Sequence, residues 1–392
     1  MSMSETRIGS IDSLKGWGVT LLVFLHCGLY NFANLRSIDF ENPPIYVMIL
    51  GLMVLWGGLF GLASGLVNTY RFDRRRLNPP ERIHRPARRL FAVGLAIYLL
   101  HLAYVLLTAP TSLDFETWNH QYSFIAQLFR FGSIHFSPRR FVQGTALQMI
   151  GINLMLLSVL LPILARSRRP SLWALVVAAL FMASGVGRIY LEPTYVRLLE
   201  DGRYVGAFLL SPLTSEPYPV TPYFAFACVG AALGFRFSRT ESLPRLGWLG
   251  GLGVLIVGVV GIVVFPTNLH GSGMFWLSKV TFELGVFVLI SWALLARAGF
   301  NPVAPRAVQR VSRMSLTVFV LQTPLAEGLA AALTRLAPGW NATLGVTLIF
   351  AAVNVAIWLG IVTLWSRVGY KYTLEYAWVR LFPGSTKLDD ID

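Results

Sequence analysis

Lys15 and His26 lie eleven residues apart in the first apolar segment of the chain, SIDSLKGWGVTLLVFLHCGLYNF. In an α-helix, that spacing returns the side chain to within about 20° of its starting direction, about 16 Å further along the axis. Asp12 lies about 40° from His26 in the same projection. An ammonium group can hold an anion, and an imidazole can accept a proton or act as a nucleophile. Because ionisable side chains in an apolar span are costly and usually functional, we interpret Asp12, Lys15 and His26 as one candidate site.

Other polar side chains fall inside other apolar segments. His101 is either a second base or proton relay, or a histidine that only bonds a neighbouring helix. The same structural alternative holds for His26. Gln148 and Glu283 are predicted to bind substrate or to hydrogen-bond within the protein, and Glu283 is one turn from Lys279, with which it can pair. No HExxH or other ligand spacing indicates a metal site.

Composition places these residues in a membrane protein. Hydrophobic residues make up 55% of the 392 residues, charged residues 13%, and the mean hydropathy is +0.60. No ordinary soluble domain has this balance. The two cysteines, Cys27 and Cys228, fall in apolar segments, so neither a disulfide framework nor a CxxC site is expected. We predict an all-α polytopic membrane protein.

Apolar runs of spanning length predict about ten transmembrane helices. They lie at 13–34, 45–69, 88–108, 143–165, 171–190, 218–236, 246–265, 275–297, 313–334 and 342–366. Most of the 33 Lys and Arg fall on one side if both termini are cytoplasmic, as the positive-inside rule requires. The net charge of +14 then follows from topology, and no nucleic-acid partner is implied.

The spans are expected to form one integral domain over residues 1–380, followed by a short cytoplasmic tail at 381–392. Two extracytoplasmic connections are longer than turns require. The first, about 109–142, suits an interfacial helix or a lid beside a polar substrate. In the second, about 191–217, the run from Val205 to Leu213 is too short to span the membrane.

Several short strings resemble the transmembrane acyltransferase superfamily, which includes the acyltransferase-3 and heparan-α-glucosaminide N-acetyltransferase-like proteins. The opening segment is similar to their signature of an acid, a base followed by Gly, and a His; here these are Asp12, Lys15, Gly16 and His26. Further similar strings are GLASG at 61–65, ALQMIGINL at 146–154, YPVTPYFAFACVGAALG at 218–234 and SRMSLTVFVLQTP at 312–324. Their order along the predicted spans supports the resemblance.

The resemblance implies transfer of an acyl group from a cytoplasmic thioester such as acetyl-CoA. The acceptor would be a hydroxyl or amine of an extracytoplasmic glycan or lipid-linked saccharide. His26 would act as general base or carry the acyl group, with Asp12 and His101 as further catalytic candidates, while Lys15 would meet a donor phosphate. No permanently bound cofactor is expected, since acyl-CoA is a substrate.

The basic segment YRFDRRRLNPPERIHRPARRL gives a second candidate for donor binding. Guanidinium groups hold phosphates by paired contacts, and Arg85, Arg88 and Arg89 are predicted to bind those of coenzyme A. The alternative is that these residues only satisfy the positive-inside rule and contact anionic headgroups.

Gly57, Gly61 and Gly65 recur every fourth residue and predict a face that another helix approaches closely. The alternative is that this face leaves room for the thin pantetheine arm of the donor, with Ser64 contributing a hydroxyl group. The sequence leaves both possibilities open.

The chain departs from the family pattern at two positions. Gln322 stands where many relatives have a His, so it can orient a substrate but cannot exchange protons near neutral pH. Lys15 stands where Arg is usual, which keeps the charge and loses the bidentate fork. The glucosaminide branch places its active His in the loop after the first helix, and residues 31–44 contain none, which favours the acyltransferase-3 arrangement.

The leading hypothesis is therefore an acyl-CoA-dependent O- or N-acetyltransferase of the bacterial cytoplasmic (inner) membrane, with membrane lipids and a saccharide or glycolipid acceptor as partners. Its oligomeric state is left open. The alternative is a transporter or flippase for an anionic or glycolipid substrate. Inverted repeats with broken helices would favour transport, and the sequence shows none.

Overall fold

A computed structural model describes residues 8–34, 56–77, 84–110, 112–113, 120–214, 217–240, 247–265, 273–298 and 301–381. The chain divides into two compact units. Unit 1 comprises Met1–Leu55, Leu102–Arg140 and Pro302–Asp392, and unit 2 comprises Trp56–His101 and Phe141–Asn301. The expectation of a single domain over 1–380 stays a prediction, and the 381–392 tail lies almost wholly outside the described residues.

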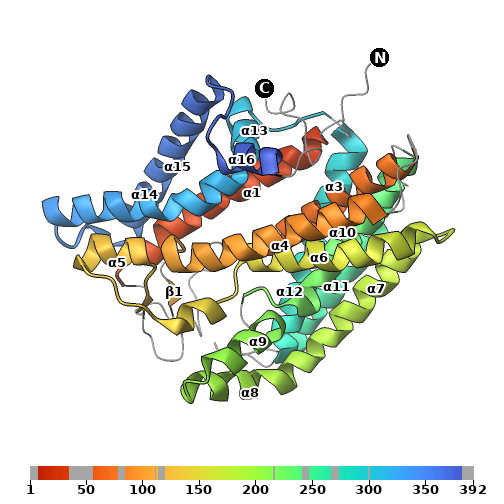
Figure 1. Cartoon of the computed structure of the whole chain (residues 1–392), viewed down its shortest axis with the longest axis horizontal. Helices are drawn as coiled ribbons and strands as arrows, with labels where there is room; N and C mark the ends of the chain where they lie inside the picture. Colours follow the sequence, from red (N-terminus) through yellow and green to blue (C-terminus); the bar gives the residue numbers. More distant parts are fainter. Residues whose placement is uncertain are drawn as a thin grey trace. The chain divides into compact units, whose positions relative to one another are not determined.

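Unit 1 is built around the first helix and the C-terminal helices (Figure 1). Its elements are α1 (Gly9–Gly28), η1 (Leu29–Asn31), α5 (Phe124–Phe131), η3 (Pro138–Val142, which ends in unit 2), α13 (Arg306–Arg313), α14 (Ser315–Leu336), η5 (Trp340–Ala342), α15 (Leu344–Ser366) and α16 (Leu374–Leu381). A two-residue antiparallel pair, β1 (Ser112–Leu113) and β2 (His120–Gln121), precedes α5. Helix α1 packs against α13, α14 and α15.

Small residues allow α1 to approach these neighbours. A Cβ atom added at Gly16 would overlap the backbone carbonyl oxygen of Val308 in α13, and one added at Gly28 would lie 3.0 Å from the Ala351 Cβ in α15. Ser13 holds the same helix to the segment before α13, because its hydroxyl oxygen accepts from Val303 N at 3.0 Å. The Gly of the opening signature therefore has a packing role here.

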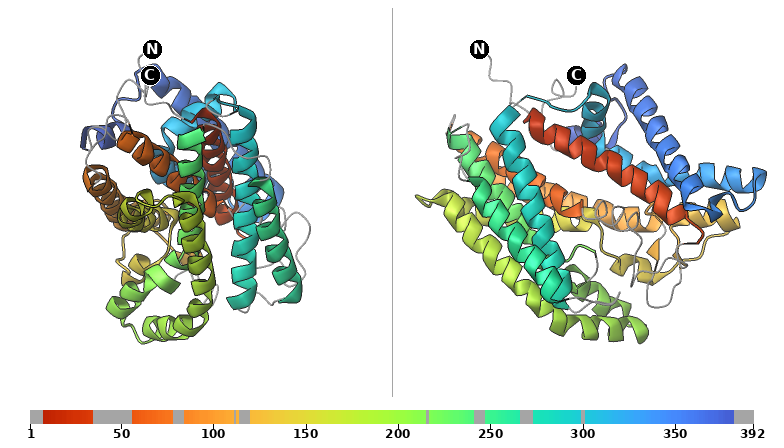
Figure 2. Two further views of the ribbon diagram at one scale, coloured as in Figure 1. Left: turned by 90° about the vertical axis from the view of Figure 1, so that its right-hand side faces the viewer. Right: turned by 180° about the vertical axis from the view of Figure 1, so that it is seen from behind.

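Unit 2 is a bundle in which long helices pack along one another (Figure 2). Its elements are α3 (Gly57–Leu77), α4 (His84–Leu107, whose last residues belong to unit 1), α6 (Ala146–Ala165), α7 (Pro170–Ser184), η4 (Gly185–Gly187), α8 (Arg188–Glu200), α9 (Tyr204–Thr214), α10 (Val220–Thr240), α11 (Gly247–Val264) and α12 (Gly273–Ala298). Helix α10 packs against α3 and α7, and α11 packs against α12.

Eight of the described helical segments are long and apolar enough to cross a membrane. They are His84–Leu107, Ala146–Ala165, Pro170–Glu200, Val220–Thr240, Gly247–Val264, Gly273–Ala298, Ser315–Leu336 and Leu344–Ser366. Each overlaps one of the ten predicted spans. The other two predictions, 13–34 and 45–69, fall on α1 and α3, which do not reach that apolarity over the described residues. Helix α3 continues to Leu77 through the basic segment, and residues 45–55 lie outside the described part.

The two long connections contain helices of their own. The first contains α5, a short helix whose C-cap, Gly132, has a left-handed φ of 67°. In the second, α8 and α9 pack against each other. Helix α9 has only 11 residues, which agrees with the expectation that the Val205–Leu213 run is too short to span.

Candidate functional site

His26 meets a polar side chain of α14, which lies beside α1 in unit 1 (Figures 1 and 2). The side-chain nitrogen of Gln322 lies 2.9 Å from His26 Nδ1, although the residues are 296 positions apart. The same nitrogen donates to the Phe319 carbonyl oxygen at 3.2 Å. Gln322 is fully buried and His26 is half-buried. Two residues predicted on separate grounds are thus brought into direct contact.

The Gln322 amide determines which nitrogen of neutral His26 carries the proton. An amide nitrogen only donates, so Nδ1 accepts and the hydrogen of the neutral ring lies on Nε2. The second amide hydrogen goes to the Phe319 carbonyl. Reversing the amide would place two carbonyl oxygens against each other, so Phe319 supports the observed orientation. His26 therefore presents an N–H group at Nε2.

Aromatic side chains surround this pair. The Tyr30 ring centroid lies 5.3 Å from that of His26, and the Tyr104 ring lies 5.0 Å from the Phe319 ring. Both side chains are buried, and the Tyr104 hydroxyl interacts with the Gln322 side chain, whereas Gln322 Oε1 has no hydrogen-bond partner among the described residues. Buried polar atoms without partners are uncommon in folded proteins. Gln322 Oε1 is therefore a candidate for contact with a substrate.

Arg140, in η3, places a buried cation near Tyr104. Its side chain is 2% exposed, and its Nε donates to the Val105 carbonyl oxygen at 2.9 Å. Burial lowers the pKa of Arg140 to about 10, so the guanidinium remains charged at neutral pH, and it interacts electrostatically with Tyr104. The aromatic side of the His26 site thus has a fixed positive charge.

Lys15 lies toward the beginning of α14, where a carboxylate caps the helix. The carboxylate of Glu375 in α16 accepts from the Leu316 and Thr317 backbone nitrogens and from the Thr317 hydroxyl. These nitrogens have no partner within the first turn of α14, and the helix dipole favours an anion there. Burial raises the pKa of Glu375, and attraction to Lys15 opposes that shift. Lys15 therefore helps to neutralise this half-buried carboxylate.

A second polar cluster lies one turn beyond His26. Arg130 of α5 forms an ion pair with Glu327 of α14, with Nε 2.7 Å from Oε2 and Nη2 3.1 Å from Oε1. Arg130 also donates to the Asn31 side-chain oxygen at 3.2 Å. The Glu327 side chain is only 4% exposed. These contacts tie α5 to α14 and to η1, which follows α1.

His101, in unit 2, belongs to a separate hydrogen-bonded group. Its Nδ1 pairs with the Thr145 hydroxyl at 2.9 Å, and that hydroxyl also accepts from the Gln148 backbone nitrogen as the N-cap of α6. The Gln148 side-chain nitrogen donates to the Ser211 hydroxyl at 3.5 Å. His101 Nε2 and Gln148 Oε1 are buried without a hydrogen-bond partner among the described residues. The structure thus brings these two predicted residues together.

Glu283 connects α12 to α3 and α10 within unit 2. Its carboxylate accepts from the Gly58 backbone nitrogen at 2.8 Å and from the Tyr223 hydroxyl at 3.1 Å. Lys279 interacts with it electrostatically. The hydrogen bonds come from Gly58 and Tyr223 because α3 and α10 pack directly against this face. The contacts of Glu283 therefore favour its structural interpretation, while its substrate-binding role stays a prediction.

The comparison with protein families matches the acyltransferase-3 family, described as an acyltransferase domain, to residues 8–365. The match covers both units and most of the chain. The chain belongs to the acyltransferase-3 family. The comparison with curated proteins finds no match.

Membership in the acyltransferase-3 family identifies the chain as a membrane acyltransferase and confirms the resemblance drawn from the opening signature. Asp12, Lys15 and His26 lie on one continuous helix, α1, as their spacing predicted. Asp12 and Lys15 are both half-buried. Within the described residues, no three His, Cys, Asp or Glu side chains are placed to hold a metal ion.

The predicted donor-binding residues of this acyltransferase-3 protein are distributed over two units. Lys15 belongs to unit 1, whereas Ser64, on α3, and the α4 arginines belong to unit 2, so their convergence on one donor stays a prediction. Arg85 and Arg88 are exposed and Arg89 is half-buried. The Ser64 hydroxyl accepts from the Asn68 side chain of its own helix at 3.3 Å.

Sequence reasoning missed Glu327, Arg130, Arg140, Tyr104 and Glu375. The sequence contained a signal for Glu327, because an acidic residue inside the predicted span 313–334 is as costly to bury as His26 and is a functional candidate on the same ground. The two arginines lie in the connection that was expected to form an interfacial helix or lid. No local pattern marks Tyr104 or Glu375, because only the packing of distant segments gives them polar neighbours.

Proposed function

We propose that this membrane acyltransferase transfers an acyl group, most simply acetyl, from cytoplasmic acyl-CoA to a hydroxyl or amine of an extracytoplasmic glycan or lipid-linked saccharide. We propose further that α1 and the helix containing α3 also cross the membrane, which gives about ten spans with both termini cytoplasmic. The excess of arginine on one side of the predicted topology supports this orientation, and the bacterial inner membrane is the proposed location.

The observation that carries this proposal is the hydrogen bond between His26 and Gln322. It places the one titratable ring of α1 against a buried amide whose oxygen, Gln322 Oε1, has no hydrogen-bond partner among the described residues. A positioned imidazole with an unoccupied polar atom beside it suits proton transfer to a polar substrate. The family supplies the reaction class.

The proton on His26 Nε2 constrains the chemistry. In direct transfer, the acceptor oxygen or nitrogen attacks the thioester carbonyl carbon, its proton passes to His26, the C–S bond breaks and the thiolate of coenzyme A takes up the proton. A route through acyl-His26 instead forms an N–C bond on the ring and expels the thiolate before the acceptor attacks. Both routes need a lone pair on the attacking or accepting ring nitrogen.

Gln322 can supply that lone pair by a half-turn of its amide. Oε1 would then accept from Nδ1–H, the ring proton would move from Nε2, and Nε2 would become the base. The rotation gives up the bond to the Phe319 carbonyl, so the observed orientation is the resting one. Before rotation, Nε2–H can donate to the thioester carbonyl oxygen and polarise it.

The test uses the purified full chain in liposomes with radiolabelled acetyl-CoA, measuring release of free coenzyme A and labelled product. His26→Ala is expected to lower the rate by about 10²- to 10⁴-fold, as for loss of a general base. His135→Ala is the matched control, because His135 is exposed in the loop after α5. Full activity in His26→Ala, or substrate movement across the membrane without coenzyme A release, would contradict the proposal and favour the transporter alternative.

A further inference from the structure

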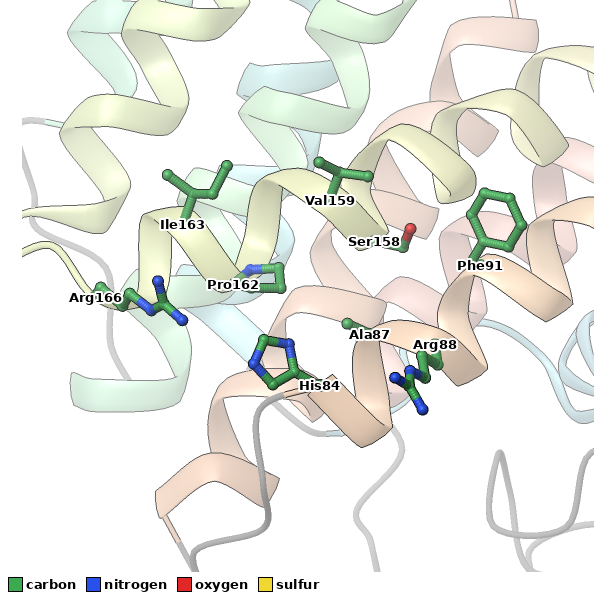
Figure 3. Close-up of a pocket in the computed structure, with 9 residues that line it drawn as sticks. All are labelled: His84, Ala87, Arg88, Phe91, Ser158, Val159, Pro162, Ile163 and Arg166. Carbon is green, nitrogen blue, oxygen red and sulfur yellow. The ribbon is translucent and has the colours of Figure 1, made fainter.

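A groove in unit 2 lies between α4 and α6, at the end where α4 begins and α6 ends (Figure 3). Its volume is about 410 Å³. Its polar part includes His84 and two arginines, Arg88 and Arg166, and its apolar part includes Phe91, Val159 and Ile163. Among the described residues that line it, none is acidic.

The groove exists because α4 and α6 touch closely at one level and cannot do so along their whole length. A Cβ atom at Gly94 would lie 2.7 Å from the Gly151 carbonyl oxygen, and one at Gly151 would lie 2.9 Å from the Gly94 carbonyl oxygen. Closer to the start of α4 and the end of α6, larger side chains line the space between the helices. Pro162 interrupts the hydrogen bonds of α6 at the same level.

The charges in the groove are not neutralised by the described part of the chain. Arg88 and Arg166 are exposed, and neither forms an ion pair or a side-chain hydrogen bond with any residue that the structure describes. Figure 3 shows the His84 ring between the side chains of Arg166 and Arg88. Two guanidinium groups near one imidazole favour an anion with several oxygen atoms, because guanidinium binds phosphate oxygens in pairs.

The apolar part of the groove indicates that the anionic ligand also has an apolar group. Phe91, Val159 and Ile163 are 45%, 62% and 61% exposed, and they lie on two helices that are apolar enough to span a membrane. In a membrane these side chains contact acyl chains rather than water. A ligand that fits both parts has a phosphate at one end and a hydrocarbon chain at the other.

We propose that this groove is a binding site for an anionic phospholipid, with its phosphate against Arg88 and Arg166 and one acyl chain along Val159 and Ile163. This assigns Arg88 to a lipid rather than to the phosphates of coenzyme A. The proposal does not depend on the acyl-transfer mechanism, because it concerns a surface of unit 2 with its own charge and shape.

The experiment measures lipid bound to the full chain in detergent by native mass spectrometry. Dioleoyl phosphatidylglycerol is added to one sample and dioleoyl phosphatidylcholine to another, so the acyl chains are identical and only the headgroup differs. The double variant R88Q/R166Q is compared with R236Q/R297Q, which loses the same charge from exposed positions outside the groove. Val159→Trp, which fills the apolar part, is compared with Ile256→Trp on the exposed face of α11.

The wild type is expected to retain phosphatidylglycerol in preference to phosphatidylcholine. R88Q/R166Q is expected to weaken that binding about tenfold, and Val159→Trp to weaken it as well, with both controls unchanged. Equal losses in R88Q/R166Q and R236Q/R297Q would overturn the proposal, because bulk charge would then explain the binding. Displacement of the lipid by coenzyme A, with loss of coenzyme A binding in R88Q/R166Q, would also overturn it and restore the donor-site interpretation.

Discussion

Gly65→Ala provides a direct test of the packing between α3 and α10. A Cβ atom at this position would overlap the Ala227 carbonyl oxygen and lie 2.8 Å from two backbone carbons of Ala227. These are backbone atoms, so no side-chain rotation relieves the contact, and the helices must separate by roughly 1 Å. Overpacking of this kind costs about 1–3 kcal/mol.

Gly61→Ala is the matched control on the same face of α3. Its added methyl group would meet the Asn153 side-chain nitrogen at 3.4 Å and the Phe226 Cβ at 3.5 Å, which are ordinary contact distances. Alanine also has a higher helix propensity than glycine by about 1 kcal/mol, so this substitution is expected to be neutral or stabilising. Gly65→Ala gains the same helix propensity. The difference in stability between the two variants therefore reports the steric overlap at position 65.

The assay is thermal unfolding of both variants in detergent, followed by size-exclusion chromatography of the fraction that remains monodisperse. Gly65→Ala is expected to lower Tm by several degrees relative to Gly61→Ala. Equal Tm values would refute the packing argument. If instead Gly61→Ala leaves Tm unchanged and weakens acyl-CoA binding, the glycine face holds the donor arm, which is the alternative drawn from the sequence.

Three further predictions concern unit 1. Gln322→Leu removes both hydrogen bonds of the amide and is expected to abolish the preference for a proton on His26 Nε2, which the ¹⁵N chemical shifts of the ring report; unchanged shifts would show that Gln322 does not select the tautomer. Glu327→Gln leaves Arg130 without its carboxylate and is expected to lower the unfolding free energy by about 2 kcal/mol. Arg130→Lys keeps the positive charge and loses the paired hydrogen bonds. If Glu327→Gln destabilises the protein no more than Arg130→Lys does, the paired hydrogen bonds and not the buried charge account for the effect. Because burial raises the pKa of Glu375, its contribution to stability is complete at low pH and is lost as the pH rises through the raised value. The wild type should therefore lose Tm relative to Glu375→Gln when the pH is increased from about 4.5 to neutrality, and parallel pH profiles would contradict this assignment.

The helices were largely predictable because their signal is local. A run of about 20 apolar residues has few alternatives to a membrane-spanning helix, and eight of the ten predicted runs correspond to such helices. The two exceptions, α1 and α3, are less apolar because they contain the polar and charged residues that were predicted to form the site. Lys15 and His26 were found from one helix's periodicity, because both belong to that helix.

The acyltransferase-3 family and the polar stripe of α1 were thus determined by the sequence itself. The tertiary structure alone decided what the stripe contacts. His26 meets Gln322 across 296 residues, Lys15 lies near a carboxylate close to the C-terminus, and Glu327 pairs with Arg130 of α5. Local patterns report periodicity and cost of burial, whereas hydrogen-bond partners depend on which distant helices pack side by side. For that reason the sequence could single out His26 as a candidate, and only the packing of α14 against α1 could show which of its nitrogens carries the proton.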